Sequence, residues 1–411
     1  MIDETPSGFF SFPLWLGTWL FSGGVVGAVL GGGLAVPASA AQEMPQRGLT
    51  AVPALVRVYD AILDGRFEGV PALLDRACPP APREACRVLD AVSTWWHIQL
   101  DPLNMTRDAA FLSKVETAIA ATAAWTEREP QRAEAWFYLG GAYGARVQWR
   151  VLRGERLAAV HDGRRIRNAL ERALTLDPGM ADAYFGLGLY HYYADVAPTV
   201  FKMLRWFLLL PGGDRVRGME EMLRARHAGQ LVGSEAAYQL YVVYIWYEKQ
   251  PARALGLLGE LRARHPHNPH FAQAIADIQD FYLDDTVASL RTWEALLDAA
   301  RRGQVAEPGM AEASARLGIA SQLDQLSRGE AGLEHLRAVI AAQPVAPFGA
   351  VARGHLQLGQ TLEHLGRGAE ATAAYRAAIA AAGRNDPLRV AASARAALRA
   401  LEHTSRRATA R

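Results

Sequence analysis

Apolar residues recur at helical spacing through most of the chain after residue 50. One series consists of Tyr238, Tyr241, Val242 and Ile245. Intervals of three, four and seven positions place these side chains on one face of a helix. A second series consists of Ala254, Leu258 and Leu261. Pro266 follows it and ends the periodic stretch, so the pattern predicts a pair of helices over 235–266.

The same pair of patterns returns along the chain. A shift of 34 residues leads to Ala272, Ile275, Ala276 and Gln279, then to Ala288, Thr292 and Ala295. Further units contain Trp136, Leu139, Gly140 and Tyr143; Tyr184, Leu187, Gly188 and His191; Ser314, Leu317 and Gly318; and His355, Leu358, Gly359 and Leu362, followed by Ala371, Tyr375 and Ala378. A period of this length is typical of stacked helical repeats, because no single unit can bury its apolar face alone.

These residues resemble the tetratricopeptide-repeat family, whose first helix carries an aromatic residue, then Leu-Gly, then Tyr. The resemblance covers roughly residues 86–404. It implies an all-α, right-handed superhelical solenoid of antiparallel helix pairs, in which small residues let paired helices approach closely. We expect an N-terminal helical cap with a degenerate repeat over 47–130, repeats over 131–383, and a C-terminal capping helix with a basic tail over 384–411.

Two of the units are longer than the basic repeat. Trp136 and Tyr184 are 48 residues apart, and Tyr184 and Tyr238 are 54 residues apart. We expect the first excess to lengthen both helices of its pair, since each turn takes 3.6 residues. The second excess includes the apolar segment 196–211, which we expect to form an amphipathic helix packed inside the solenoid. The alternative is a membrane-associated assembly or trafficking factor that contacts the membrane through this segment.

Residues 184–223 also resemble, over about 40 residues, a eukaryotic repeat family linked to inclusion-body clearance and the outer mitochondrial membrane. Phe-Gly-Leu-Gly-Leu, an apolar segment and Gly-Gly-Asp-Arg carry this second resemblance. The match is local, and no function is transferred from it.

The N-terminal region has the composition of an export signal. From Phe9 to Ala41 the residues are apolar, small or glycine, and no Lys or Arg occurs before Arg47. Small residues around Ala40 and Ala41 are typical of a signal-peptidase site. Asp3 and the length of the apolar run favour the alternative, an uncleaved membrane anchor. We expect an exported protein, periplasmic or associated with the cell envelope, with cleavage near Ala41.

The two cysteines, Cys78 and Cys86, flank three prolines. This spacing matches neither a zinc site nor a redox Cys-x-x-Cys motif. In an exported protein the pair favours a disulfide that closes the loop, and two free buried thiols are the alternative.

The charge balance and the absence of known catalytic motifs argue against several classes of function. The chain has 44 basic and 42 acidic residues, a net charge of +2. This balance predicts no nucleic-acid partner, because nucleic-acid binding needs a basic face. No phosphate loop, nucleophile elbow or zinc-protease helix occurs, so we expect no cofactor and no enzymatic activity.

Two sites that contain histidine could each have either a chemical or a structural role. His265, His267 and His270 lie close enough in sequence to bind a metal, but prolines and an asparagine among them favour a turn between repeats. His191 and Asp195 lie one helical turn apart and would suit acid–base chemistry, although no third group accompanies them. We therefore expect a hydrogen-bonded structural pair there.

The tetratricopeptide resemblance implies that the first helices line a concave groove. Counting along each repeat identifies the predicted partner-binding residues as Phe185, Tyr192, Tyr193, Gln239, Trp246, Tyr247, Gln273, Asp280 and Phe281. Aromatic side chains dominate binding hot spots, and glutamines suit the backbone of a peptide. We expect a scaffold or adaptor whose partner is another protein or an extended peptide, with membrane contact through the N-terminal segment as a further option. The alternative is that these rings pack against the next repeat or under residues 196–211.

Overall fold

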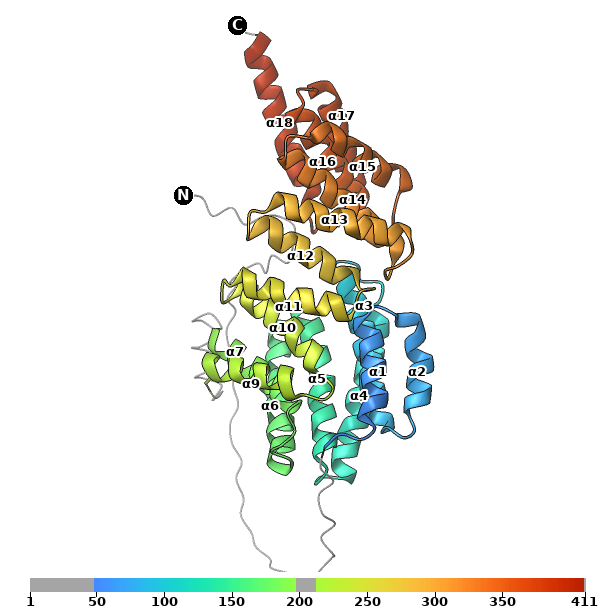
Figure 1. Ribbon diagram of the computed structural model, residues 1–411. Helices are drawn as coiled ribbons and strands as arrows, with labels where there is room; N and C mark the ends of the chain where they lie inside the picture. Colours follow the sequence, from blue (N-terminus) through green and yellow to red (C-terminus); the bar gives the residue numbers. More distant parts are fainter. Residues whose placement is uncertain (1–47, 197–211, 410–411) are drawn as a thin grey trace, which may run out of the picture. The chain divides into compact units, whose positions relative to one another are not determined.

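The computed structural model describes residues 48–196 and 212–409, with side chains as far as residue 403. Apart from one 3-10 turn, every regular element in these ranges is an α-helix (Figure 1). The elements are α1 (Val52–Leu63), η1 (Phe67–Gly69), α2 (Val70–Ala77), α3 (Arg83–Leu100), α4 (Asp108–Arg128), α5 (Ala133–Leu152), α6 (Arg156–Leu176), α7 (Ala183–Val196), α9 (Arg215–Ala228), α10 (Gly233–Trp246), α11 (Pro251–Arg264), α12 (Pro269–Phe281), α13 (Thr286–Arg301), α14 (Pro308–Gln325), α15 (Gly329–Ala342), α16 (Ala350–His364), α17 (Gly368–Ala382) and α18 (Val390–Thr409).

Helices that follow one another pack together as hairpins (Figure 1). The pairs are α3 with α4, α5 with α6, α7 with α9, α10 with α11, α12 with α13, α14 with α15, and α16 with α17. Each first helix also contacts the second helix of the preceding pair, and the described residues belong to one compact unit. The predicted all-α solenoid of helix pairs is confirmed, whereas the exact limits of the cap and the repeat region stay predictions.

Proline marks the helix ends that the sequence predicts. Pro130, Pro178 and Pro266 each lie two residues beyond the end of α4, α6 and α11. Proline also opens α11, α12 and α14 near their first positions, where its missing N–H costs no hydrogen bond.

The glycines of the repeat pattern lie where paired helices touch. A Cβ placed on Gly140 would be 2.7 Å from the Leu170 side chain of the partner helix. A Cβ on Gly188 would be 2.7 Å from the backbone oxygen of Gly218. Real Cβ atoms do not approach this closely, so a larger residue would displace the Leu170 side chain at the first position and, at the second, where the clash is with backbone, would force the helices apart. The role that the repeat pattern assigns to small residues is therefore confirmed at these positions.

The predicted lengthening of one repeat is also confirmed. Helices α5 and α6 contain 20 and 21 residues. The corresponding helices α10 and α11 contain 14 residues each.

The N-terminal helices make contacts that the repeat pattern does not predict. Tyr59 of α1 and Trp96 of α3 both donate hydrogen bonds to Glu235 of α10. Trp96 also packs edge-on against Tyr238 and Phe271, with ring centroids 4.7 and 6.1 Å apart. Helices α1 and α3 therefore contact repeats far along the chain as well as their neighbours in sequence.

Cys78 and Cys86 form the expected disulfide, with their Cα atoms 6.6 Å apart. Cys78 follows the last residue of α2, and Cys86 lies in the first turn of α3. The bond thus ties these two helices together across the proline loop, and the alternative of two free thiols is wrong.

Two predicted segments are not tested by the fold. The N-terminal segment 1–47 and residues 197–211 lie outside the described residues, so their predicted roles stay predictions. Within the described helices, none combines the length and apolar character needed to cross a membrane.

Candidate functional site

The C-terminal ends of two first helices carry a cluster of exposed aromatic side chains. Trp246 and Tyr247 end α10, and they are 40% and 41% exposed. Phe281 and Tyr282 end α12, and they are 47% and 37% exposed. The rings of Trp246 and Tyr282 meet edge-on, 6.3 Å apart, which joins the two helix ends. We name these four residues the aromatic rim.

The rim continues onto α7 through Tyr247. Its ring lies 5.5 Å from that of Tyr193 and 5.8 Å from that of Tyr192. Burial raises the pKa of Tyr193, with Tyr247 and Tyr192 adding to the effect. The predicted neighbourhood of Tyr193 and Tyr247 is therefore present, while their role in binding a partner stays a prediction.

Four of the predicted groove residues are not freely exposed. Tyr192 is buried, and its hydroxyl donates to Glu248. Gln239 is buried, and its amide donates to Gln148 Oε1 of α5 at 2.9 Å. Gln273 is also buried, and Phe185 packs half-buried against the main core. These four residues are thus less accessible than an open groove would require, and their role in binding a partner stays a prediction.

Polar residues lie on α12 beside the rim. Asp280, a predicted residue, accepts hydrogen bonds from Gln322 at 3.0 Å and from Gln325 at 3.3 Å. Asp277 lies one turn earlier, and its Oδ2 atom is buried without a hydrogen-bond partner. The pKa of Asp277 is raised to about 8, chiefly by desolvation; Arg353 opposes the shift and Asp280 adds to it. The sequence signal for Asp277 is an acidic residue four positions after the predicted Gln273, one helical turn further along the same helix.

Arg353 of α16 brings a positive charge to this region. Burial lowers its pKa, while Asp277 and Asp101 raise it. Asp101 follows α3, and its two carboxylate oxygens accept hydrogen bonds from the backbone N–H of Phe348 at 3.0 Å. Helices α3, α12 and α16 thus place Asp101, Asp277 and Arg353 within electrostatic reach of one another, an arrangement that sequence reasoning missed because it depends on the docking of α3.

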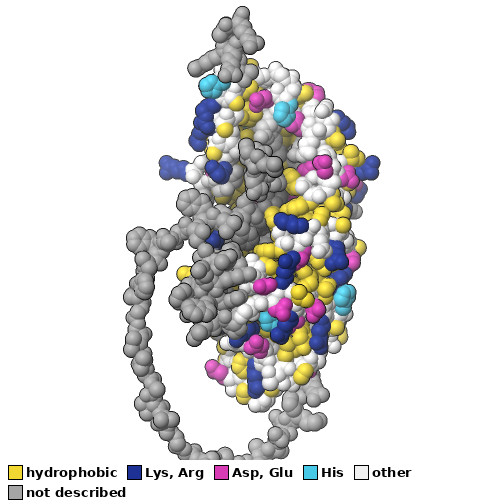
Figure 2. Space-filling view, turned by 90° about the vertical axis from the view of Figure 1, so that its left-hand side faces the viewer, with side chains coloured by type: hydrophobic (Ala, Val, Ile, Leu, Met, Phe, Trp, Pro, Cys, Tyr) yellow, Lys and Arg dark blue, Asp and Glu magenta, His cyan; other side chains and the backbone are white. Residues whose placement is uncertain are grey.

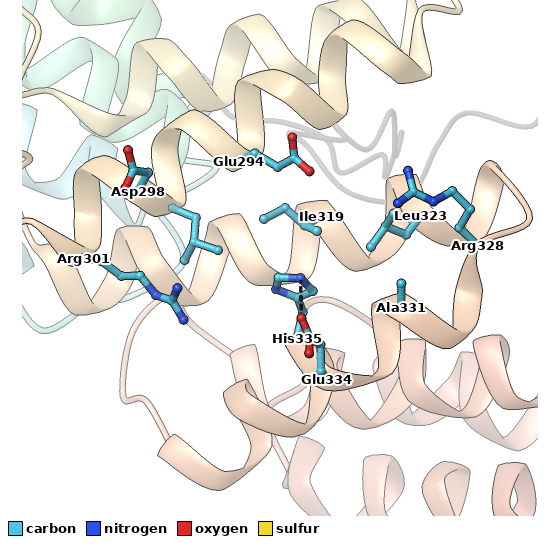
Figure 3. A pocket seen from close by; sticks show the side chains of 10 residues that line it. Glu294, Asp298, Arg301, Ile319, Leu323, Arg328, Ala331, Glu334 and His335 are labelled. Carbon is cyan, nitrogen blue, oxygen red and sulfur yellow. Dashed lines mark ion pairs between the residues drawn. The ribbon is translucent and has the colours of Figure 1, made fainter.

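A separate shallow cavity of about 340 Å³ lies among α13, α14 and α15. Figure 3 shows Glu294, Asp298 and Arg301 of α13 on one side and His335 of α15 on the other. Its lining mixes acidic, basic and apolar side chains, and no charge sign dominates. The imidazole of His335 lies 3.6 Å from Glu334, and burial lowers its pKa.

The histidines near residue 267 have three different partners. His265 Nε2 lies 3.3 Å from Ser234 Oγ, His267 Nδ1 lies 2.8 Å from Asp64 Oδ2, and His270 Nε2 lies 3.1 Å from Tyr238 Oη. Asn268 accepts from the N–H of His270 and caps α12. The geometry is that of the turn between repeats, which was the favoured interpretation.

His191 does not pair with Asp195. Its Nδ1 atom lies 2.6 Å from Glu221 Oε2 of α9, and Arg217 also contacts Glu221. The expected pair of His191 and Asp195 is therefore wrong, because the antiparallel partner helix supplies the nearer carboxylate.

The face in Figure 2 shows hydrophobic side chains gathered in patches between basic and acidic ones. No large surface of one charge sign is visible on the part of that face which the structure describes. Such a surface offers apolar contact with charged groups at its margins.

No protein-family model matches this chain. No curated protein matches it either. Among solved structures, human IFIT1 as a dimer with m7Gppp-AAAA is 12% identical, with 90% of this chain and 84% of that chain covered and a TM-score of 0.44. A monomeric mutant of IFIT1 with Gppp-AAAA is 11% identical, covers 84% of this chain and 81% of that chain, and has a TM-score of 0.41.

These two structures correct one expectation. The near-neutral net charge led us to exclude nucleic acid as a partner, yet a helical protein with which this chain aligns over most of its length is solved with capped RNA. The exclusion is wrong, because net charge over a whole chain says little about one face of a solenoid. At this level of identity the likeness concerns the fold and assigns no ligand to this chain.

Proposed function

We propose that this chain is a binding scaffold, without catalytic activity of its own, that holds an extended segment of another protein against the aromatic rim. The observation that carries the proposal is the gathering of four exposed aromatic side chains at the adjoining ends of α10 and α12. Exposed single apolar residues are ordinary, but a contiguous aromatic cluster is typical of an interaction site.

The chemistry of the rim suits a peptide. Trp246 and Tyr282 offer broad rigid faces, which lose little conformational entropy on binding. Asp280 of α12 and the amides of Gln322 and Gln325 of α14 supply polar groups beside the rings. Aromatic faces with adjacent hydrogen-bonding groups are a recurring way to bind extended segments, especially proline-rich ones.

The test is a peptide array probed with the full-length protein and with two double variants. Trp246→Ala with Tyr247→Ala removes half of the rim, and Leu157→Ala with Val345→Ala removes exposed apolar residues elsewhere. Because hot-spot truncations cost about 2–4 kcal/mol of binding each, we expect the first variant to lose the peptides that the wild type binds. The second variant should keep them.

Both variants should retain the helical content and melting temperature of the wild type. Equal binding by both variants would contradict the proposal, and so would unfolding of the rim variant, since the rings would then belong to the core. The oligonucleotide Gppp-AAAA is titrated in parallel. If the wild type binds this RNA and none of the peptides, and the rim variant does not bind the RNA, the partner is a nucleic acid and not a protein.

The proposal also places the protein outside the cytoplasm. The disulfide between Cys78 and Cys86 supports this, because such bonds persist in oxidising compartments. N-terminal sequencing of protein from the cell envelope is expected to give Ala41 as the first residue. A start at Met1 in that fraction would instead support an anchor, and recovery of the protein only from the cytoplasm would contradict export.

A further inference from the structure

One acidic side chain beside the rim lacks the partner that a buried carboxyl normally has. Asp277 lies on α12 between Gln273 and Asp280, one helical turn from the former. Its Oδ2 atom is buried and accepts no hydrogen bond from any residue that the structure describes. The great majority of buried side-chain oxygens are hydrogen-bonded, so the lack of a partner for this atom is unusual and suits a group that binds a ligand.

The side chain of Asp277 is only partly shielded from water. The residue keeps some solvent accessibility, although its Oδ2 atom is buried. A ligand group can therefore approach the carboxyl from the solvent side.

Two tyrosines lie near the same carboxyl. Tyr241 of α10 and Tyr282 at the end of α12 both lie close enough for the charge of Asp277 to raise their pKa. Tyr282 belongs to the rim, so the carboxyl lies within electrostatic reach of the exposed rings. Tyrosine faces attract cations through the negative charge above the ring.

The charged groups around Asp277 are negative in sum. Asp280 lies on the same helix, Asp101 follows α3, and Arg353 projects from α16. No ion pair within 4 Å joins Asp277 to Arg353 among the described side chains, and Arg353 also interacts with Asp101. With Asp277 ionised, Asp280 adds a second negative charge nearby and Arg353 is the cation that acts on it without an ion pair, so a ligand cation would meet an unpaired carboxylate.

We propose that Asp277 is the recognition site for one lysine or arginine side chain of the segment bound at the aromatic rim, with Tyr241 and Tyr282 beside the cation. This inference rests on the proposed function and specifies its ligand. The cation pairs with the carboxylate of Asp277, and the carboxyl gives its proton to solvent as the ion pair forms. Binding at neutral pH therefore releases a proton from the complex.

The test uses matched pairs of acetylated decapeptides on an array, identical except for a central lysine or norleucine. Pairs that bind the wild-type protein are then measured by calorimetry at pH 7. Because a hydrogen bond to a charged group is worth about 1.5–3 kcal/mol, we expect the lysine peptides to bind about 10- to 100-fold more tightly. Heats measured in buffers of different ionisation enthalpy should show proton release for lysine peptides alone.

Asp277→Asn keeps the shape of the side chain and removes its charge. We expect this variant to bind lysine peptides no more tightly than norleucine peptides, with the norleucine affinity unchanged, which also shows that it is folded. The control is Asp298→Asn on α13, at the cavity among α13, α14 and α15, and it should bind the peptides as the wild type does.

The outcomes separate the two proposals. Equal affinities for both members of each pair in the wild type would overturn the role of Asp277 and leave the rim proposal standing. Retention of the lysine preference in Asp277→Asn would overturn it as well. Failure of the wild type to bind either member of any pair would overturn both proposals.

Discussion

Tyr59 and Glu235 are 176 positions apart in sequence, yet the hydroxyl of Tyr59 donates a 3.0 Å hydrogen bond to the buried carboxylate of Glu235. Trp96 donates a second bond to the same oxygen at 2.9 Å. Desolvation raises the pKa of Glu235, and these two bonds oppose the shift. Glu235 therefore links α1 and α3 to α10. Both hydrogen bonds to its Oε2 atom come from these N-terminal helices.

We expect Tyr59→Phe to lower the free energy of unfolding by about 1–3 kcal/mol, because it leaves part of a buried carboxylate without a partner. Urea denaturation measures the change. Tyr184→Phe is the control, since Tyr184 contacts Arg224 through its ring and not through its hydroxyl. Equal effects of the two substitutions would contradict this account of the Glu235 bonds.

The hairpins, the glycine contacts and the disulfide were all predictable, because each depends on residues near one another in sequence. Gly188 signals its close helix contact through its place in the repeat pattern. The burial of Gln239 was not predictable in the same way, because it depends on Gln148 of a different repeat. Asp277 was missed for a related reason: its environment includes Arg353, 76 positions away (353 minus 277).

The disulfide should contribute measurably to stability. Its bonded cysteines are eight positions apart, and the loop-closure model assigns such a short loop about 2–3 kcal/mol. We expect Cys78→Ser with Cys86→Ser to lower the free energy of unfolding by this amount. A reducing agent should destabilise the wild type equally and leave the double variant unchanged. Alkylation of two thiols in the unreduced, unfolded wild type would contradict the bond.

Two glycines offer opposite outcomes for the same substitution. Gly188→Ala would place a Cβ 2.7 Å from the oxygen of Gly218 and 2.8 Å from Met222, so we expect a loss of about 1–3 kcal/mol. Gly256 lies in α11 with nothing within 4 Å of an added Cβ. Gly256→Ala should therefore stabilise the protein by about 0.5–1 kcal/mol through helix propensity. Thermal melts of the two variants must shift in opposite directions if the α7–α9 contact is as close as described.

We expect the ionisation of Asp277 to change how the free energy of unfolding depends on pH. Its pKa is about 8 in the folded chain, against an ordinary value of 3.8. A carboxyl with a raised folded pKa holds its proton more tightly in the folded state, so its stabilising contribution is complete below about pH 3.8 and is lost as the pH rises through about 8. Asp277→Asn mimics the protonated form at every pH and removes this loss.

We therefore expect the stability of Asp277→Asn, relative to the wild type, to increase between about pH 4 and pH 8 and to level off above that range. The slope is at most about 1.4 kcal/mol per pH unit, and solvent access to the side chain reduces it. Urea denaturation of both proteins at matched pH values gives the difference, and titrating groups that the two share, such as His265 and His270, cancel from it. Parallel curves for Asp277→Asn would show that its carboxyl is already ionised in the folded protein at neutral pH, because only a protonated carboxyl can produce the slope.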